Sequence, residues 1–273
     1  GSLELLVRGP PHSPGVKADG NFVALNYGDI AIQDLSLKAN VPDVTRPLTT
    51  DATVLVSELK TAGKTFRDLS LALTTDDNRE LKASVRVDGD AKLALGVEGT
   101  VDEDNEGLAM RAFSLSWPEA TWTLQQPTHL AFGGGRIALA PPLALASGPQ
   151  TLKVAAVKDG ERVDARIDLG AFDLSKLPRI AVPEDLGLGG TLSGHVAAKG
   201  RMARPDADVD LTLSDGKARG YEGLGLQVKA RYVKDRATGT LGAELNAARV
   251  SSKFDVPVQG VLRRRNEPLS LTV

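Results

Sequence analysis

Alternation of apolar and polar residues with a period of two is the feature that most constrains this chain. In residues 81–88, Leu81, Ala83, Val85 and Val87 alternate with charged or hydroxyl side chains. Successive side chains of a β-strand point to opposite faces, so this run predicts a strand with one apolar and one polar face. The same pattern, complete or shortened, recurs in 91–97, 163–169, 207–213, 224–232, 241–245, 254–258 and 269–273.

Turn-forming residues separate these runs. Glycine or asparagine supplies the positive φ of a tight turn, which predicts antiparallel hairpins between neighbouring strands. The expected turns are 88–90, 104–107, 158–160, 214–216 and 263–268. We therefore predict an all-β fold with a long, largely antiparallel sheet. The helix expected is very short, near 172–178, and Pro178 ends it.

A loose internal repeat accompanies the alternation. Residues 32–39 (IQDLSLKA) resemble residues 66–73 (FRDLSLAL), and residues 221–228 (YEGLGLQV) are a more distant copy. Repetition of one amphipathic strand unit predicts an array that grows in one direction. The alternative is that any all-β protein rich in hairpins shows such similarities.

Composition excludes several classes of protein. The chain has 33 Lys and Arg against 35 Asp and Glu, so no basic excess indicates nucleic-acid binding. Two Trp and three Tyr are too few for the aromatic girdles of a transmembrane barrel, and no apolar run reaches ~18 residues. The absence of cysteine excludes disulfides, thiolate metal sites and cysteine nucleophiles.

Sequence motifs for catalysis or metal binding are incomplete. Gly63-Lys64-Thr65 resembles the end of a phosphate-binding loop, but Glu58 stands where its first glycine belongs. A calcium loop starting at Asp102 would need a glutamate where Phe113 stands, which favours a solvated acidic turn. The sequence has no G-x-S-x-G nucleophile motif that Gly133-Gly134-Gly135 could complement as part of an oxyanion hole. The three glycines therefore predict a turn or bulge.

The three histidines, His12, His129 and His195, lie far apart and lack a second ligand at metal-binding spacing. His195 falls on the polar face of its run, where we expect solvent exposure. The three arginines of 263–265 predict a solvated turn, with contact to lipid headgroups or an acidic partner as the alternative. We therefore expect neither an enzyme nor a bound metal or cofactor.

Residues 122–232 resemble the TamB family, translocation and assembly module proteins related to AsmA-like envelope proteins. The resemblance includes a leucine–aspartate–leucine–serine type stretch at 172–175 and a leucine–glycine pair followed by a strand at 186–196. It continues through a glycine, a short spacer and Pro205 into a second strand at 206–216. Residues before 122 resemble the family only in their general sequence pattern and not in specific motifs.

This resemblance implies a sheet curled into an open half-pipe, a β-taco, with an apolar groove. It also implies a periplasmic protein of a Gram-negative bacterium, anchored in the inner membrane outside this segment and partnered by an outer-membrane assembly barrel. The implied role is a lipid-conducting bridge that shields phospholipid acyl chains. The alternatives are a scaffold that binds outer-membrane protein clients by β-augmentation, and a plain β-sandwich domain.

We treat 1–273 as one elongated β-groove segment of a longer protein, with Gly1-Ser2 as a tag remnant and approximate repeat sections 3–121 and 122–273. The alternating apolar residues are the predicted groove lining. They are Leu81, Ala83, Val85, Val87, Leu93, Leu95, Val97, Val163, Ala165, Ile167, Leu169, Val209, Leu211, Leu213, Leu224, Leu226 and Val228.

Overall fold

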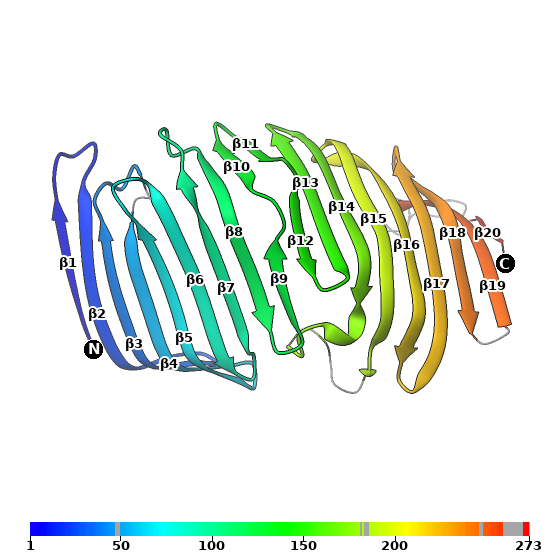
Figure 1. Ribbon diagram of the computed structural model, residues 1–273, viewed down its shortest axis with the longest axis horizontal. Helices are drawn as coiled ribbons and strands as arrows, with labels where there is room; N and C mark the ends of the chain where they lie inside the picture. Colours follow the sequence, from blue (N-terminus) through cyan, green and yellow to red (C-terminus); the bar gives the residue numbers. More distant parts are fainter. Residues whose placement is uncertain (47–49, 181, 183–185, 246–247, 259–269, 273) are drawn as a thin grey trace. The chain divides into compact units, whose positions relative to one another are not determined.

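The computed structural model describes residues 1–46, 50–180, 182, 186–245, 248–258 and 270–272 (Figure 1). Strands joined by short turns make up most of this part of the chain, which confirms the predicted all-β fold class. The predicted helix is a single 3-10 turn, η1 (Leu174–Lys176), and the side chain of Asp173 caps it by accepting the Ser175 N–H at 3.0 Å.

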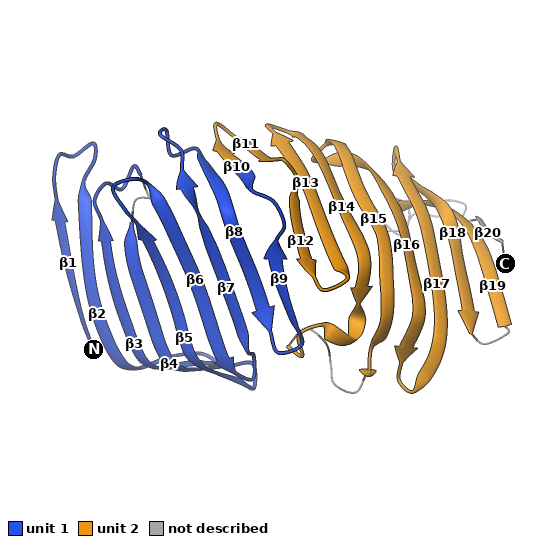
Figure 2. Ribbon diagram, viewed as in Figure 1, with its two compact units in different colours: residues 1–130 blue, residues 131–273 orange. Residues whose placement is uncertain are grey.

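The chain divides into two compact units, Gly1–Leu130 and Ala131–Val273 (Figure 2). Unit 1 contains β1 (Ser2–Arg8), β2 (Gly15–Tyr27), β3 (Ile30–Val41), β4 (Asp51–Thr61), β5 (Lys64–Thr75), β6 (Glu80–Gly89), β7 (Leu93–Val101), β8 (Gly107–Trp117) and β9 (Ala120–Leu124). The strand β10 (Thr128–Gly133) spans the boundary between the units.

Unit 2 contains β11 (Arg136–Ala140), β12 (Leu143–Ser147), β13 (Gln150–Asp159), β14 (Arg162–Asp173), β15 (Gly189–Arg201), β16 (Arg204–Ala218), β17 (Tyr221–Val233), β18 (Arg236–Leu245), β19 (Ala248–Pro257) and β20 (Ser270–Thr272).

Each unit is an antiparallel meander. In unit 1 every strand from β1 to β9 pairs with the next strand in sequence. In unit 2 the strands from β13 to β20 do the same. β11 and β12 both pair with β13, at Ala138↔Val157 and Leu143↔Val154. Consecutive pairing confirms the hairpins expected at 88–90, 104–107 and 158–160.

The predicted turn at 214–216 is wrong. These residues lie inside β16, where the register shifts between Leu213 and Gly216 and Asp215 has a φ of 51°. A residue with positive φ can form a β-bulge within a strand as well as a turn between strands, and bulges are common where a strand bends. The predicted turn at 263–268, with its three arginines, lies outside the described residues.

The internal repeat has a structural basis in backbone conformation. Its third residue has a positive φ in each copy: 49° at Asp34, 47° at Asp68 and 73° at Gly223. In β3, Gln33 and Asp34 are both exposed while Ile32 and Leu35 are half-buried, and β5 shows the same pattern around Asp68. In both strands the positive-φ residue thus interrupts the alternation. Two consecutive residues are exposed there, and the half-buried residues on either side of them are three positions apart.

Full burial is restricted to a small part of the described residues. In unit 1, Leu81, Val101 and Trp122 are 3%, 1% and 3% exposed, and in unit 2 Ala138 and Leu145 are buried. Most apolar strand residues are consequently covered only in part.

Candidate functional site

The antiparallel register aligns apolar residues into unbroken rows across the strands of unit 1. Directly paired residues share a face of the sheet, so each row lies on one surface. The first row consists of Leu3, Gly20, Leu37, Val54, Leu71, Val85, Leu95, Leu115 and Trp122. The second consists of Leu5, Ala18, Ala39, Ala52, Leu73, Ala83, Val97 and Phe113. Together they form the unit 1 apolar face.

Unit 2 carries an equivalent surface, the unit 2 apolar face, made of three main rows. One row is Leu145, Leu152, Leu169, Gly194, Leu211, Val228 and Leu241. The next is Leu143, Val154, Ile167, Val196, Val209, Ala230, Gly239 and Phe254. The third is Ala156, Ala165, Ala198, Ala207, Tyr232 and Ala237. A charged residue does not interrupt any of these rows.

The apolar faces are open to solvent. Leu71 is 42% exposed on the unit 1 apolar face, and on the unit 2 apolar face Ile167 is 42% and Leu241 44% exposed. Among the described elements, extensive contacts within each unit join strands that are paired in the sheet, apart from η1, which lies against β15. The exposed fractions of Leu71, Ile167 and Leu241 show that a second layer does not fully cover these residues.

The opposite face of unit 2 is charged. One row there runs Lys153, Asp168, His195, Asp210 and Lys229, with acidic positions flanked by basic ones. Lys229 Nζ lies 3.4 Å from Asp210 Oδ2, and Arg166 Nε donates to Asp168 Oδ1 at 2.8 Å. The hydrogen bond from Arg166 lowers the pKa of Asp168, which keeps this carboxyl charged. Polar and apolar residues are thus segregated between the two faces.

Ten of the seventeen predicted lining residues belong to the rows that define the two apolar faces. The other seven lie on strand pairs outside these rows: Leu81, Val87, Leu93, Val163, Leu213, Leu224 and Leu226. In unit 1, Val85 pairs with Leu95, and Ala83 pairs with Val97. Leu81 differs from the others because it is only 3% exposed and so belongs to the buried core. In unit 2, Ile167 and Val209 occupy the same row through Val196.

The structure adds residues to these faces that the sequence analysis did not name. Leu37, Val54 and Leu71 extend the unit 1 apolar face, and Val154 and Val196 complete the unit 2 apolar face. The signal for the first three was present, since 35–39, 52–56 and 69–73 also alternate.

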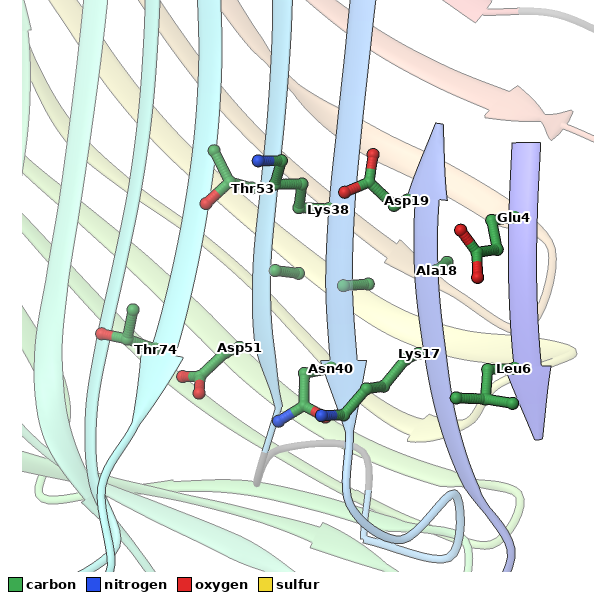
Figure 3. A pocket seen from close by; sticks show the side chains of 12 residues that line it. Glu4, Leu6, Lys17, Ala18, Asp19, Lys38, Asn40, Asp51, Thr53 and Thr74 are labelled. Atoms are coloured by element: carbon green, nitrogen blue, oxygen red, sulfur yellow. The ribbon is translucent and has the colours of Figure 1, made fainter. Parts of the chain in front are cut away.

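A hollow of about 420 Å³ in unit 1 lies mainly over polar positions (Figure 3). Its lining includes the paired row Glu4, Asp19, Lys38 and Thr53, which lies on the face opposite the apolar rows. Charged and polar side chains make up most of the lining, together with Leu6, Ala18, Ala39 and Ala52. Desolvation of the charged groups would oppose the entry of a hydrocarbon chain. The apolar surface available to such a chain is therefore the open face of the sheet.

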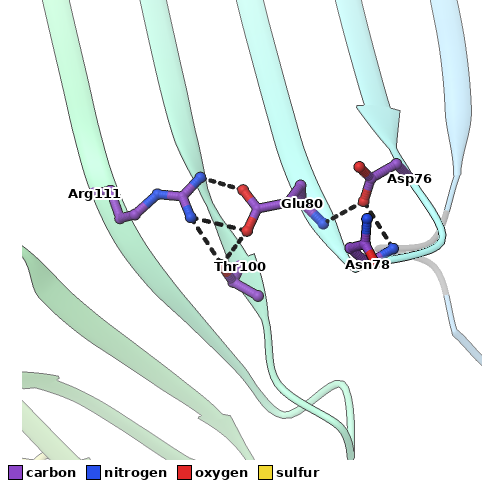
Figure 4. A network of polar contacts seen from close by, with 5 residues as sticks. All are labelled: Asp76, Asn78, Glu80, Thr100 and Arg111. Atoms are coloured by element: carbon purple, nitrogen blue, oxygen red, sulfur yellow. Dashed lines mark hydrogen bonds and ion pairs between the residues drawn. The ribbon is translucent and has the colours of Figure 1, made fainter.

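A polar network joins the ends of three strands in unit 1 (Figure 4). Glu80 Oε1 accepts hydrogen bonds from Arg111 Nη1 and Thr100 Oγ1, both at 2.8 Å. Asp76 Oδ1 accepts the backbone N–H of Asn78 and of Glu80, each at 2.9 Å. The Arg111 hydrogen bond is the main cause that lowers the pKa of Glu80 to about 2. This network fastens β6, β7 and β8 together, and Arg111 also lines a hollow of about 480 Å³ with residues that include Ala83, Val97 and Phe113.

Two histidines have carboxylate partners that spacing in the sequence does not reveal. His195 Nε2 lies 2.9 Å from Asp208 Oδ1, and its side chain is 25% exposed, so it lies on the polar face as expected but is half-buried. Asp208 lies on the neighbouring strand, β16. His129 Nε2 lies 2.7 Å from Asp102 Oδ2. Among the described residues, no three His, Asp or Glu side chains gather into a group that could hold a metal ion.

The other motifs occupy turns. Gly63 lies in the β4–β5 hairpin, and Gly133, Gly134 and Gly135 form the β10–β11 turn with φ values of 136°, 52° and 80°. The expected glycine turn at 133–135 is therefore confirmed.

Comparison of the chain with protein-family models, with curated proteins and with solved structures finds no match. Within the described residues, no helix is long and apolar enough to cross a bilayer. The functional argument consequently depends on the geometry of the faces.

Proposed function

We propose that this protein shields phospholipid acyl chains on its two apolar faces and so serves as a lipid-conducting module. The observation that carries the proposal is the unbroken register of apolar residues, such as Val154, Ile167, Val196 and Val209, across successive strands. A hydrocarbon chain lying along such a row would meet only apolar side chains.

The energetics favour this use of the surface. Moving a hydrocarbon chain through water costs about 0.8 kcal/mol per CH₂, so a sixteen-carbon tail faces a barrier of about 12 kcal/mol. Contact with Leu, Val and Ala removes much of this cost, and it is non-directional, which allows sliding. Ladder hydrogen bonds satisfy the backbone polar groups, so the surface consists of side chains.

The length of the rows fits a path better than a pocket. At ~4.8 Å per strand, the rows span roughly 30–40 Å within one unit. One lipid tail extends over about half of a ~30 Å hydrocarbon core, or ~15 Å. A row is therefore longer than a single lipid tail. An acyl chain can move along the row and stay in contact with apolar side chains.

The setting proposed with this function follows the family resemblance. It is the periplasm of a Gram-negative bacterium, with an inner-membrane anchor outside this segment and an outer-membrane assembly barrel as partner. The charged face seen in unit 2, with pairs such as Lys229 and Asp210, supports the proposal because that face would remain in water while the apolar face carries lipid.

Site-specific photo-crosslinking tests the proposal. Crosslinkers at Val85, Leu95, Val209 and Leu226 should capture phospholipid, whereas crosslinkers at Arg86, Lys92, Asp210 and Gln227 should not. Val85 and Arg86, like Val209 and Asp210, are neighbours on one strand that point to opposite faces, so each pair is internally matched. Equal labelling of both sets would refute lipid shielding, and client proteins crosslinked along strand edges would favour the β-augmenting scaffold instead.

A further inference from the structure

One end of the unit 2 sheet carries an excess of basic residues. The antiparallel pairing brings the β10–β11, β13–β14, β15–β16 and β17–β18 turns to the same end of the strands. This hairpin end consists of residues 133–136, 158–162, 200–205 and 233–236, which contain seven Lys or Arg and three Asp or Glu. The whole chain has a formal net charge of −2. Positive charge is therefore concentrated at the hairpin end.

The register places arginines of successive strands in one row at the hairpin end. Arg162 on β14 is paired with Arg201 on β15, and Arg201 is also paired with Arg204 on β16. Strand alternation places this row on the charged face of unit 2, together with Asp168 and His195. Like charges directly opposite each other destabilise a sheet, so the arginine row does not favour folding by itself.

Carboxylates of the same sheet balance only some of these charges. Arg204 Nε donates a hydrogen bond to Asp235 Oδ1 at 2.9 Å. Asp159 stands between Arg136 and Arg162 in the register, yet the described residues show no ion pair from Asp159 to either arginine. The exposed arginines of the hairpin end that form no ion pair within the described part of the chain are Arg136, Arg162 and Arg201. Their guanidinium groups are therefore available to an anionic partner.

An exposed apolar residue stands at the tip of the arginine row. Met202 lies in the turn between Arg201 and Arg204, and it is 57% exposed. Its backbone N–H donates to the backbone oxygen of Glu161 at 2.7 Å, which joins the β15–β16 turn to the β13–β14 turn. An apolar residue flanked by long basic side chains suits a membrane surface, because the guanidinium groups stay at the headgroups while the apolar residue enters. An acidic protein would need only the charges.

We propose that the hairpin end docks unit 2 on the surface of an anionic phospholipid bilayer, with Arg162 and Arg201 at the headgroup phosphates and Met202 inserted between headgroups. Guanidinium groups donate paired hydrogen bonds in a plane that matches phosphate oxygens. Each basic residue close to an anionic membrane strengthens binding about fivefold. The inference concerns the charged face at the ends of the strands, and it does not require an acyl chain on either apolar face.

Co-sedimentation with vesicles at low salt tests the proposal. Anionic vesicles contain equal parts of phosphatidylglycerol and phosphatidylcholine, and neutral vesicles contain phosphatidylcholine alone. The wild type should prefer the anionic vesicles, and Arg162→Gln/Arg201→Gln should bind them about 25-fold more weakly. The control Lys153→Gln/Arg219→Gln removes the same net charge from β13 and from the β16–β17 turn at the opposite end of the sheet. This control should bind like the wild type.

A second variant and a soluble polyanion separate a bilayer from an acidic protein. Met202→Ser should bind anionic vesicles about threefold more weakly, because less apolar surface enters the headgroup region, and its binding to poly-glutamate should equal that of the wild type. Wild-type binding to poly-glutamate as tight as that to anionic vesicles, with no effect of Met202→Ser, would overturn the bilayer as the partner. Equal wild-type binding to both kinds of vesicle, or equal losses in the two double variants, would overturn docking through the hairpin end. Circular dichroism of each variant confirms that the sheet is intact.

Discussion

Single residues with positive φ set the bends of the strands. Asp34 and Asp68 adopt this conformation without being glycine. Asparagine and aspartate tolerate the left-handed region better than other residues, because their short side chains hydrogen-bond locally. Ser57 supports Asp34 by donating from Oγ to Asp34 Oδ2 at 3.1 Å. The backbone conformation at the third position of the repeat therefore explains the aspartate there, in addition to the polarity of its side chain.

Substitution of Asp68 tests this conclusion. Asp68→Gly should raise the free energy of unfolding by up to about 1 kcal/mol, because glycine reaches a φ of 47° without steric cost, whereas Asp68→Ala should lower it by a similar amount. Chemical denaturation measures both. Ser70→Gly, two residues along the same strand, is the control and should be destabilising; stabilisation by both glycines would contradict the role of φ.

The Glu80–Arg111 ion pair predicts how the stability of the folded chain depends on pH. The pKa of Glu80 is lowered from 4.5 to about 2 in the folded chain, so the folded state favours the ionised carboxylate. The stability contributed by this group is complete above pH 4.5 and is lost as the pH falls toward 2. Melting temperatures of Glu80→Gln should therefore fall less steeply than those of the wild type over this interval.

Glu103→Gln is the control for Glu80→Gln, because the Glu103 side chain is 90% exposed. It should keep the wild-type slope. Identical slopes for the wild type and Glu80→Gln would show that the network does not couple folding to the ionisation of Glu80.

At the scale of strands, glycines allow neighbouring backbones to approach within the apolar rows. A Cβ on Gly194 would lie 1.9 Å from the backbone oxygen of Asp210, and Gly194 has a φ of 134°. Only glycine fits this position in the β15–β16 ladder. The gap in the row at Gly194 is thus a consequence of strand pairing.

Gly194→Ala should lower the free energy of unfolding by roughly 2–4 kcal/mol, because the new methyl group forces the two strands apart. Gly242→Ala is the matched control, since its Cβ would meet its nearest neighbour at 3.8 Å. Urea denaturation compares them, and comparable losses at the two sites would contradict the steric explanation.

At the scale of the whole molecule, each unit carries its own apolar face. Val85 lies on one and Val209 on the other. A charge placed in a row opposes a hydrocarbon chain through desolvation. Val209→Asp should therefore abolish binding of an acyl probe to unit 2 without changing its binding to unit 1. The total amount of probe bound should fall by about half.

A fluorescent fatty acid measures the amount bound. Thr212→Asp, on the same strand but on the charged face with Gln227, should bind like the wild type. Val85→Asp combined with Val209→Asp should remove binding from both units. Undiminished binding by the folded double variant would contradict the assignment of these faces.

The sequence alone predicted strands at runs such as 81–88, 91–97, 163–169 and 207–213 and, within each run, the residues that share a face. Alternation is a local property, since a residue and its second neighbour share a face whatever the rest of the chain does. Leu93, Leu95 and Val97 could therefore be assigned to the apolar face. The family membership inferred from 122–232 stays a prediction.

Only the tertiary structure decided which residues of different strands are neighbours. Pairing register depends on contacts between strands, and the alternating pattern of one strand does not specify its offset from the next. The arginine row and the His195–Asp208 contact depend on register, so the linear spacing of these residues did not reveal them. The bulge at Asp215 likewise follows from strand pairing, because the same residues suit a turn when they are considered alone.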